Sequence, residues 1–328
     1  MKIGIIGATG AVGRQMLECL EERHIEAEEI RLFASARSAG KKIQFNGTEL
    51  TVQEISHDGF EGLDYVLGAV SNALSKEYAP SIVKAGAVYI DNSSAFRLDK
   101  DIPLVVPQIN GADALDHHGI IANPNCSTII TMMAVAPIAR ISPITTLYAT
   151  TFQAVSGVGV GGIAELDEQI DAIYNHKEVE TKAFRKQIAY NCLAEIGSYT
   201  DNGYTTEEMK MQNEGRKILH LPDMKVTCTC VRVPVYRSHS ISVSCITEKP
   251  VGIKEAIDAI NAFPDVQYIE NDIPTPLETS DQDVVYVGRM RKDLCNDNGL
   301  ALWCCGDQIR KGAATNAVEI MEYLIAHK

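Results

Sequence analysis

The sequence lacks a positive charge excess and any apolar run of membrane length, and each absence excludes a class of partner. Its formal net charge is −13, which argues against binding to nucleic acid or to an anionic membrane surface. The longest strongly apolar stretch, residues 129–139, is too short to span a bilayer. An anionic ligand would therefore have to be held by local arginine and lysine side chains.

Paired cysteine motifs are missing as well. The chain has nine cysteines, and neither the Cys228-x-Cys230 spacing nor the adjacent Cys304 and Cys305 fits a CxxC pair or a zinc motif. We therefore expect free thiols, no metal site and a reducing cytoplasm. The first residues run directly into an apolar segment without a signal-peptide pattern, which leads to the same expectation of a cytoplasmic protein.

What is present indicates an α/β protein of two domains. A chain of 328 residues, 45% hydrophobic and 22% charged, is long for one core. Apolar strands alternate with helices in the first 125 residues, which predicts a Rossmann-type doubly wound sheet. The expected strands are 2–8, 30–34, 64–70, 87–90, 104–106 and 119–122, with helices near 12–20 and 73–84 and a hairpin at 43–55. The final helix, within residues 308–328, is expected to return to this domain.

A glycine-rich turn follows the first strand and predicts a dinucleotide cofactor. The glycines have the spacing GxxGxxG, a variant of the dinucleotide fingerprint, between a strand and a helix. The expected contact residues are Gly7, Thr9, Gly10, Ala11, Val12 and Gly13. The loop after the second strand, residues 35–42, has three basic residues and no acid. An acid there would hold the ribose 2′-hydroxyl of NAD, so we predict NADP, with Arg37 and Ser38 at its 2′-phosphate.

Cys126 stands where a strand gives way to a helix. The strand at 119–122 is followed by a turn at 123–125 and by an apolar helix from about 127 to 136. Backbone N–H groups and the helix dipole at such a helix start favour a thiolate over a thiol. Cys126 is therefore the candidate nucleophile, although a cysteine is also commonly a small buried apolar residue.

The second half of the chain predicts an α+β domain over residues 126–307. A β-rich run at 145–155 leads into a glycine-rich segment, and two further strands are expected at 225–235 and 240–247. We expect these two strands to be antiparallel and joined through residues 236–239. A wide sheet needs to be covered, which suggests a homodimer. Residues 175–202 carry no chemical signal, and we expect a helical excursion that covers the partner subunit.

Five motifs in order resemble the aspartate-β-semialdehyde dehydrogenase family over nearly the whole chain. They are Gly-Ala-Thr-Gly-Ala-Val-Gly at 7–13, Asn-Pro-Asn-Cys-Ser-Thr at 123–128, Phe-Gln-Ala-Val-Ser-Gly at 152–157, Arg-Val-Pro-Val-Tyr-Arg-Ser-His at 232–239 and Gly-Asp-Gln at 306–308. The resemblance implies NADPH-dependent reduction of L-aspartyl-4-phosphate to aspartate semialdehyde and phosphate, a step towards lysine, threonine and methionine.

The resemblance also implies roles for the residues around the thiol. Cys126 attacks the acyl phosphate and forms a thioester, which divides a difficult reduction into two easier steps. His239 is the expected acid/base, and Gln153 orients the substrate or a developing oxyanion. Asn125 assists through its amide or its backbone. Arg232 offers a planar guanidinium to the substrate α-carboxylate.

A helix expected from about Thr205 carries the remaining substrate contacts. Thr205 and Glu208 have the spacing of a capping box, which leaves Glu207 for the substrate ammonium that the resemblance implies. Lys210 shares a face with Glu207. The pair could be an ordinary exposed ion pair, but the resemblance places Lys210 with Arg97 around the phosphate. The residues expected to line the nicotinamide pocket are Ser156, Gly157 and Gln308.

Four alternatives remain open. N-acetylglutamyl-phosphate reductase has a similar layout, but its acetylated amine would not need Glu207. Glyceraldehyde-3-phosphate dehydrogenase shares the cysteine and histidine but should show an acid after the second strand. A non-catalytic NADP sensor would leave Cys126, His239 and Arg232 without a role, and full turnover by Cys126→Ala would favour it. A zinc-binding module would be detected by metal analysis.

Overall fold

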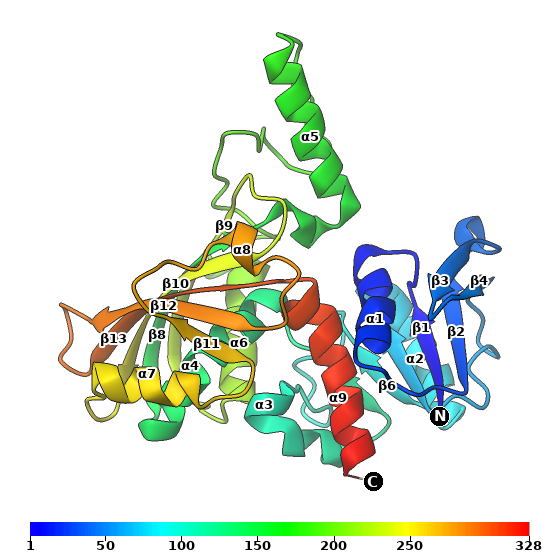
Figure 1. Cartoon of the computed structure of the whole chain (residues 1–328), viewed down its shortest axis with the longest axis horizontal. Helices are drawn as coiled ribbons and strands as arrows, with labels where there is room; N and C mark the ends of the chain where they lie inside the picture. Colours follow the sequence, from blue (N-terminus) through cyan, green and yellow to red (C-terminus); the bar gives the residue numbers. More distant parts are fainter. Residues whose placement is uncertain (328) are drawn as a thin grey trace. The chain divides into compact units, whose positions relative to one another are not determined.

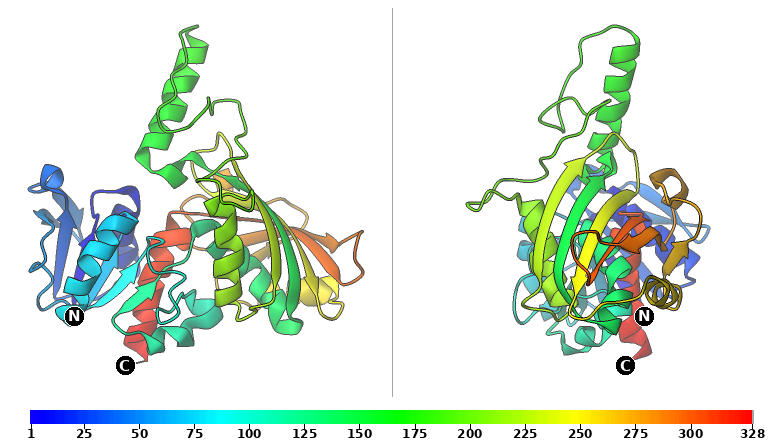
Figure 2. Two further views of the ribbon diagram at one scale, coloured as in Figure 1. Left: turned by 180° about the vertical axis from the view of Figure 1, so that it is seen from behind. Right: turned by 90° about the vertical axis from the view of Figure 1, so that its left-hand side faces the viewer.

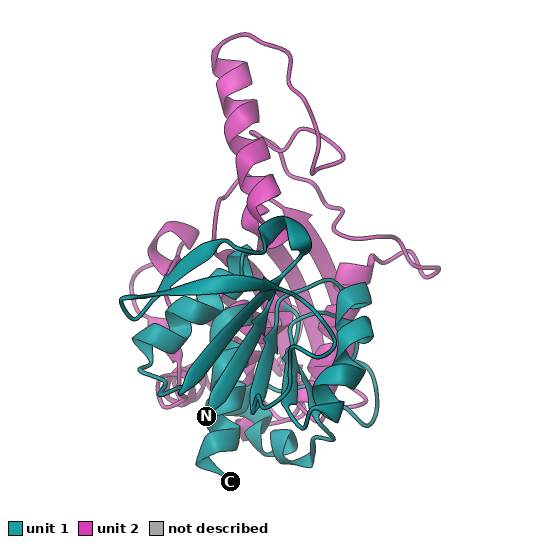
Figure 3. Cartoon of the chain, turned by 90° about the vertical axis from the view of Figure 1, so that its right-hand side faces the viewer, with its two compact units in different colours: residues 1–125, 313–328 teal, residues 126–312 magenta. Residues whose placement is uncertain are grey.

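The computed structural model describes residues 1–327 and divides the chain into two compact units (Figures 1 and 3). Unit 1 consists of residues 1–125 and 313–328, and unit 2 of residues 126–312. The return of the chain to the first unit therefore falls at 312/313, five residues after the 307/308 boundary expected from the sequence. No helix among the described residues is both long and apolar enough to cross a membrane.

Unit 1 is a seven-stranded sheet with helices on both faces, which confirms the predicted Rossmann-type fold. The strand order is β3-β4-β2-β1-β5-β6-β7, and every neighbouring pair is parallel except the β3–β4 hairpin. The strands are β1 (Lys2–Ile6), β2 (Glu29–Ala34), β3 (Lys42–Phe45), β4 (Thr48–Glu54), β5 (Tyr65–Gly68), β6 (Val88–Asp91) and β7 (Ile120–Ala122). The helices are α1 (Ala11–Glu22), α2 (Asn72–Lys84), α3 (Pro107–Asn110) and α9 (Thr315–Ala326), with short 3-10 turns at Ala36–Ser38 and Gly111–Asp116.

Two apolar clusters hold this sheet between its helices. One contains Met16, Leu20 and Ile320, so it lies under α1 and α9. The other contains Tyr78 and Ile82 of α2 together with strand residues of the opposite face. Because strands buried on both faces read as continuous apolar runs, the sequence predicted these elements within a few residues.

One predicted strand of unit 1 is wrong. Residues 104–106 form no strand and contribute one isolated bridge, from Leu104 to Ala122. Proline limits the segment on both sides: Pro103 precedes it, and Pro107 is already the first residue of α3. Proline lacks the N–H that a continued ladder would need.

Unit 2 is built on a six-stranded sheet in the order β11-β12-β13-β10-β8-β9 (Figure 2). Its strands are β8 (Ile144–Gln153), β9 (Lys225–Arg232), β10 (His239–Thr247), β11 (Val266–Ile269), β12 (Val285–Lys292) and β13 (Gly299–Gly306). Its helices are α4 (Cys126–Ile141), α5 (Val160–Tyr174), α6 (Thr206–Ile218), α7 (Ile253–Asn261) and α8 (Pro276–Thr279), with a 3-10 turn at Val155–Val158 and a π-helical turn at Arg310–Ala314. Helices α4, α6 and α7 pack on its strands.

The predicted pairing of the two strands at 225–235 and 240–247 is wrong, although their directions are opposite as expected. Strand β8 lies between them, parallel to β9 and antiparallel to β10. The connection from 233 to 238 is too long for a two-residue hairpin and contains Pro234. It runs beside the end of β8, where Val155 N–H donates to the carbonyl of Val235 at 2.8 Å, and so crosses to the far side of β8.

The expected helical excursion at 175–202 is also wrong, because the helix comes earlier, as α5, and the segment itself has no helix. Helix α5 projects from the rest of unit 2, and the irregular segment runs back along it (Figure 1). Two buried side chains of α5 hold that segment. Glu165 accepts hydrogen bonds from the backbone of Lys182 and Ala183, and Gln169 from that of Ile188.

Candidate active site

Cys126 is the first residue of α4, so its sulfur lies at the N-terminus of a 16-residue helix, as predicted. The side chain is half-buried and reduced. Its Sγ lies 3.5 Å from Nε2 of His239. A sulfur that faces both a helix N-terminus and an imidazole is in a position that favours the thiolate, the nucleophilic form.

His239 is the first residue of β10 and is fully buried. Its Nδ1 accepts a hydrogen bond from the backbone N–H of Ala154 at 3.1 Å. Burial and, to a smaller extent, the positive charge of Arg232 lower the pKa of His239 to about 3, against the opposing effect of Glu207. The ring is therefore neutral at physiological pH, and both of its nitrogens are engaged.

Gln153, Glu207 and Lys210 form a chain of polar contacts next to these residues. Gln153 ends β8, and its Nε2 donates to Oε1 of Glu207 at 3.2 Å. Its Oε1 accepts from the hydroxyl of Thr151 at 3.0 Å. Lys210 donates to the other carboxylate oxygen of Glu207 at 2.9 Å. The side chains of Lys210 and Glu207 are only 29% and 10% exposed, respectively, so they do not form an ordinary surface ion pair.

Arg232 ends β9 and is 4% exposed. Its Nη1 donates to the carbonyl of Ala154 at 2.5 Å. Burial lowers the pKa of Arg232, while Cys126 and Glu207 act in the opposite direction. An added Cβ at Gly157 would lie 2.7 Å from Nη1, so glycine is required there for the guanidinium to occupy its place.

The irregular segment 175–202 positions Arg232 from outside the sheet. Leu193 exchanges two backbone hydrogen bonds with Arg232, at 2.8 and 2.9 Å. The segment therefore adds a bridge to the outer edge of β9, directly at the arginine. Its sequence carried no chemical signal because it contributes backbone groups, which every residue has. A cavity of about 420 Å³ lies between this segment and Arg232.

The predicted capping box at the start of α6 is confirmed. Thr205 accepts from the N–H of Glu208 at 3.3 Å, and Glu208 accepts from the N–H of Thr205 at 2.7 Å. Glu208 also accepts from the N–H of Cys230 at 3.0 Å, which ties α6 to β9. Glu208 is thus structural, and Glu207, one residue earlier, faces Gln153.

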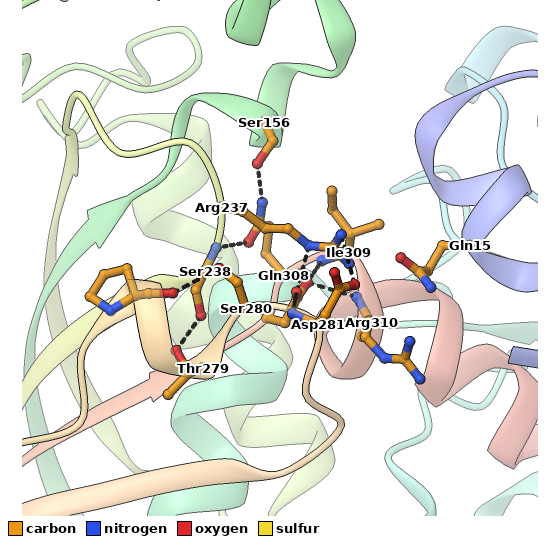
Figure 4. A network of polar contacts seen from close by, with 12 residues as sticks. Gln15, Ser156, Arg237, Ser238, Thr279, Ser280, Asp281, Gln308, Ile309 and Arg310 are labelled. Carbon is orange, nitrogen blue, oxygen red and sulfur yellow. Dashed lines mark hydrogen bonds and ion pairs between the residues drawn. The ribbon is translucent and has the colours of Figure 1, made fainter. Parts of the chain in front are cut away.

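A network that sequence reasoning did not identify holds the residues before His239 (Figure 4). Gln308 accepts from the N–H of Ser238 at 2.7 Å and donates to the hydroxyl of Ser156. Ser238 is fully buried with φ +72°, and its hydroxyl lies 2.6 Å from that of Thr279. A non-glycine residue in this conformation needs such support.

Asp307, beside Gln308, is the centre of the same network and is fully buried. It accepts from Nε of Arg237 at 2.5 Å and from the backbone of Asp281, Ile309 and Arg310 at 2.7 to 3.0 Å. These bonds fix the backbone on both sides of Gln308. The motif around Gln308 was visible in the sequence, but the pairing of Asp307 with Arg237 joins residues 70 positions apart and carries no local signal.

In unit 1 the three glycines have the close backbone contacts that a dinucleotide turn needs. Gly7 has φ +81°, and an added Cβ would lie 2.2 Å from the carbonyl oxygen of Ala69. An added Cβ at Gly13 would lie 2.3 Å from the carbonyl oxygen of Gly7. Helix α1 starts directly after Gly10, which has no side chain to cap it. The turn therefore fits a pyrophosphate at the helix N-terminus.

The other predicted site residues of unit 1 differ from one another in exposure and in hydrogen-bond partners. Arg37 and Ser38 lie in the 3-10 turn after β2; Arg37 is exposed and Ser38 is buried. Arg97 is 6% exposed and donates to the carbonyl of Asn92 at 2.7 Å. Asn125 is buried and directly precedes Cys126.

Unit 2 brings together nine of the predicted site residues, and the rest belong to unit 1. Those in unit 2 are Cys126, Gln153, Ser156, Gly157, Glu207, Lys210, Arg232, His239 and Gln308. Within residues 1–327, no three His, Cys, Asp or Glu side chains gather as ligands for a metal ion.

Comparison with known proteins identifies two family matches along the chain. Residues 2–118 match the family described as "Semialdehyde dehydrogenase, NAD binding domain", and residues 135–311 match "Semialdehyde dehydrogenase, dimerisation domain". An aspartate-semialdehyde dehydrogenase of Bacillus subtilis is 44% identical over 99% of this chain and 97% of its own length.

Solved structures of proteins with the same name are also similar to this chain. Aspartate semialdehyde dehydrogenase II of Vibrio cholerae, whose structure in complex with ASA is also known, has a TM-score of 0.97 at 42% identity and covers 99% of this chain and 98% of its own. An enzyme of Candida albicans, solved with NADP, has a TM-score of 0.78 at 26% identity, with 99% and 98% coverage.

Proposed function

The chain belongs to the aspartate-semialdehyde dehydrogenase family, and from this premise we propose how its residues carry out the reaction. The protein is an NADP-dependent oxidoreductase of amino-acid biosynthesis that reduces L-aspartyl-4-phosphate to L-aspartate 4-semialdehyde, on the route to lysine, threonine and methionine. One observation supports the chemistry most directly: the sulfur of Cys126 lies at a helix N-terminus, 3.5 Å from a buried imidazole.

Cys126 attacks the acyl carbon of the substrate. A bond forms between sulfur and carbon, the bond from carbon to the phosphate oxygen breaks, and a thioester remains on the enzyme. His239, whose Nε2 lies 3.5 Å from the sulfur, is placed to act as the acid/base of these steps. Gln153, held by Thr151 and Glu207, lies next to them and contributes an amide dipole.

The substrate's two charged ends have partners of opposite charge in unit 2. Arg232, buried at the end of β9, is suited to hold the α-carboxylate through two hydrogen bonds. Glu207 is suited to hold the α-ammonium. Lys210 compensates the charge of Glu207 and, with Arg97, serves the phosphate, while Asn125 positions the acyl group.

The cofactor is expected on the glycine turn of unit 1 and on three residues of unit 2. Gly7, Thr9, Gly10, Ala11, Val12 and Gly13 cradle the pyrophosphate, Arg37 and Ser38 take the 2′-phosphate, and Ser156, Gly157 and Gln308 border the nicotinamide. When bound, NADPH supplies the hydride that reduces the thioester. Ser156 and Gln308 are hydrogen-bonded to each other, so that border is already ordered.

A homodimer is the assembly we propose, with the open face of the unit 2 sheet as its interface. Helices α4, α6 and α7 pack on the sheet, whereas Tyr148 is 50% exposed and pairs across strands with Thr227 and Ser244. A second copy would bury this face.

We further propose that the protein works in the cytoplasm, where its nine reduced cysteines are stable, with no nucleic acid or membrane partner.

The test is phosphate-dependent reduction of NADP with aspartate semialdehyde, compared between wild type and Cys126→Ala. The variant should lose nearly all turnover and retain NADP binding, because the glycine turn lies in the other unit. Full turnover by the variant would refute the covalent role. N-acetylglutamate semialdehyde, offered in parallel, should be a poor substrate, because Glu207 has no ammonium to bind in it.

A further inference from the structure

Lys311 is a fully buried lysine to which the reaction described above gives no role. It lies in the π-helical turn at Arg310–Ala314 and is 0% exposed. Its ammonium pairs with a carboxylate oxygen of Asp265 at 3.3 Å. Burying an ammonium has a desolvation cost that its ion pair often only just offsets, so that an apolar residue of similar size can be equally stable. The presence of a charge at this place therefore needs a reason other than stability.

Two neighbouring ion pairs hold the π-helical turn to the sheet of unit 2. Arg310, the residue before Lys311, donates to the two carboxylate oxygens of Asp283 at 2.8 and 3.2 Å. Asp265 directly precedes β11, and Asp283 lies just before β12, its parallel neighbour. The N–H of Val285 donates to the carbonyl of Asp265 at 2.9 Å, which joins the starts of the two strands. Two consecutive basic residues of the turn are thus attached to two adjacent strands.

The residue after Lys311 packs directly against the nucleophile. An added Cβ at Gly312 would lie 2.9 Å from Cβ of Cys126, so the backbone of the turn and the cysteine are in contact. The N–H of Gly312 donates to the carbonyl of Asp307 at 2.9 Å. The contact with Cys126 is therefore held from two sides, by Lys311 through the chain and by Asp307 through a hydrogen bond. π-Helical turns are rare and are frequent at functional sites.

We propose that Lys311 is a positioning residue for Cys126: its buried ion pair with Asp265 anchors the π-helical turn, and the turn, through Gly312, sets the place of the nucleophile at the start of α4. The proposal rests on the nucleophilic role of Cys126 stated above and adds to it a residue that acts through another. A buried ion pair suits this task because it specifies one arrangement of the chain even where it adds little stability.

The direct test is steady-state kinetics of Lys311→Met in the phosphate-dependent reduction of NADP. Methionine has a similar length and no charge, so the turn loses its anchor while the space stays filled. We expect kcat to fall about tenfold, because a displaced sulfur no longer meets the acyl carbon in line. The KM values for phosphate and aspartate semialdehyde and the affinity for NADP should stay within about twofold, because Lys311 binds none of these ligands in the proposed function.

A purely stabilising role of Lys311 makes a different prediction. It would lower the free energy of unfolding in Lys311→Met and leave kcat per folded enzyme unchanged. Positioning predicts the reverse, a lower kcat with an unfolding free energy that is unchanged or higher in urea titrations. A kcat within about twofold of wild type, or a loss confined to the KM values, would overturn the proposal.

The matched control is Lys254→Met on α7. Lys254 is 87% exposed and pairs with Asp258 one helical turn away, so the same substitution removes an ion pair that anchors no turn. This variant should keep wild-type kcat. An equal loss of kcat in Lys254→Met and Lys311→Met would show a general effect of charge and would overturn the assignment to Lys311.

Asp265→Asn tests the same ion pair from its more exposed end and decides the question if Lys311→Met does not fold. The Asp265 carboxylate is 39% exposed, and asparagine keeps an acceptor oxygen for the ammonium. We expect a smaller loss of kcat, about threefold, and no further loss when Asp265→Asn is added to Lys311→Met, because both changes act on one contact. Wild-type kcat in Asp265→Asn, or additive losses in the double variant, would overturn the ion pair as the anchor.

Alkylation of Cys126 by iodoacetamide reports the position of the sulfur without turnover. Mass spectrometry of the Cys126 peptide should show alkylation at neutral pH that is about threefold slower in Lys311→Met, because a displaced sulfur loses part of the support that the helix N-terminus gives to its thiolate. The rate in Lys254→Met should equal that of wild type. An unchanged or faster rate in Lys311→Met would overturn the proposal. Failure of the covalent function would instead appear as an active Cys126→Ala enzyme, whatever the alkylation rates.

Discussion

Replacement of Gly312 by alanine should displace Cys126, because the added methyl group would collide with the Cα and Cβ atoms of the cysteine. Gly312 lies in the π-helical turn at Arg310–Ala314, and its N–H donates to the carbonyl of Asp307 at 2.9 Å. An added Cβ would lie 2.9 Å from Cβ of Cys126 and 3.3 Å from its Cα. Both groups are fixed to backbone, so neither can rotate away, and Cys126 or the turn must shift by roughly half an ångström.

The expected losses of stability and of kcat in Gly312→Ala follow from two effects. Overpacking a tight site costs about 1–3 kcal/mol of the free energy of unfolding. A misplacement of this order at a reacting atom lowers kcat by about 10- to 100-fold. We therefore expect Gly312→Ala to lower kcat in the phosphate-dependent reduction of NADP and to slow alkylation of Cys126, with NADP affinity retained.

The matched control is Gly161→Ala, in the first turn of α5, where an added Cβ meets nothing within 4 Å. This variant should keep wild-type kcat and gain about 0.5–1 kcal/mol of stability, because alanine is the better helix former. If Gly312→Ala retained wild-type kcat and stability, contact between the π-helical turn and the nucleophile would be refuted.

Three further predictions concern stability and substrate binding. Because the pKa of His239 is lowered to about 3 in the folded state, the unfolded chain takes up the proton first as pH falls. In urea titrations, the unfolding free energy of wild type should therefore fall relative to that of His239→Gln, by about 1.4 kcal/mol for each unit by which the pH is lowered from 6.5 to 3. Parallel curves of unfolding free energy against pH for the two proteins would contradict this. Thr205→Ala should cost about 1 kcal/mol of stability and Thr205→Ser almost nothing, since serine also caps; equal thermal shifts would exclude the capping box as the cause. Lys210→Met should raise the KM for phosphate about tenfold with NADP affinity unchanged, and an unaltered KM would remove Lys210 from the phosphate site.

Local patterns in the sequence were sufficient to predict most strands and helices of unit 1 and the start of α6. Apolar runs bounded by glycine and proline predicted its strands, and the spacing of Thr205 and Glu208 predicted the cap that the structure contains. The pairing of β9 with β8 was not predictable in this way. Strand pairing depends on contacts between distant segments, here Thr146 with Lys225 and Gln153 with Arg232, and an apolar strand fits many neighbours equally well.

The chemistry-bearing side chains were identifiable, but the groups that position them were not. Cys126, His239 and Arg232 have reactive or charged side chains within the motifs, and Glu207 lies between the two residues of the predicted capping box. By contrast, the N–H of Ala154 and the backbone bridge from Leu193 could come from any residue. Their identity is fixed by where the chain passes, which only the folded structure shows.

The most direct test of the covalent mechanism runs the reaction without phosphate. Wild-type enzyme mixed with NADP and isotopically labelled aspartate semialdehyde should form about one NADPH per active site and then stop, because the thioester has no phosphate to accept its acyl group. Mass spectrometry should find the label on the peptide that contains Cys126, and added phosphate should release it. A burst of NADPH with no label on Cys126, or with the label on another residue, would contradict the mechanism.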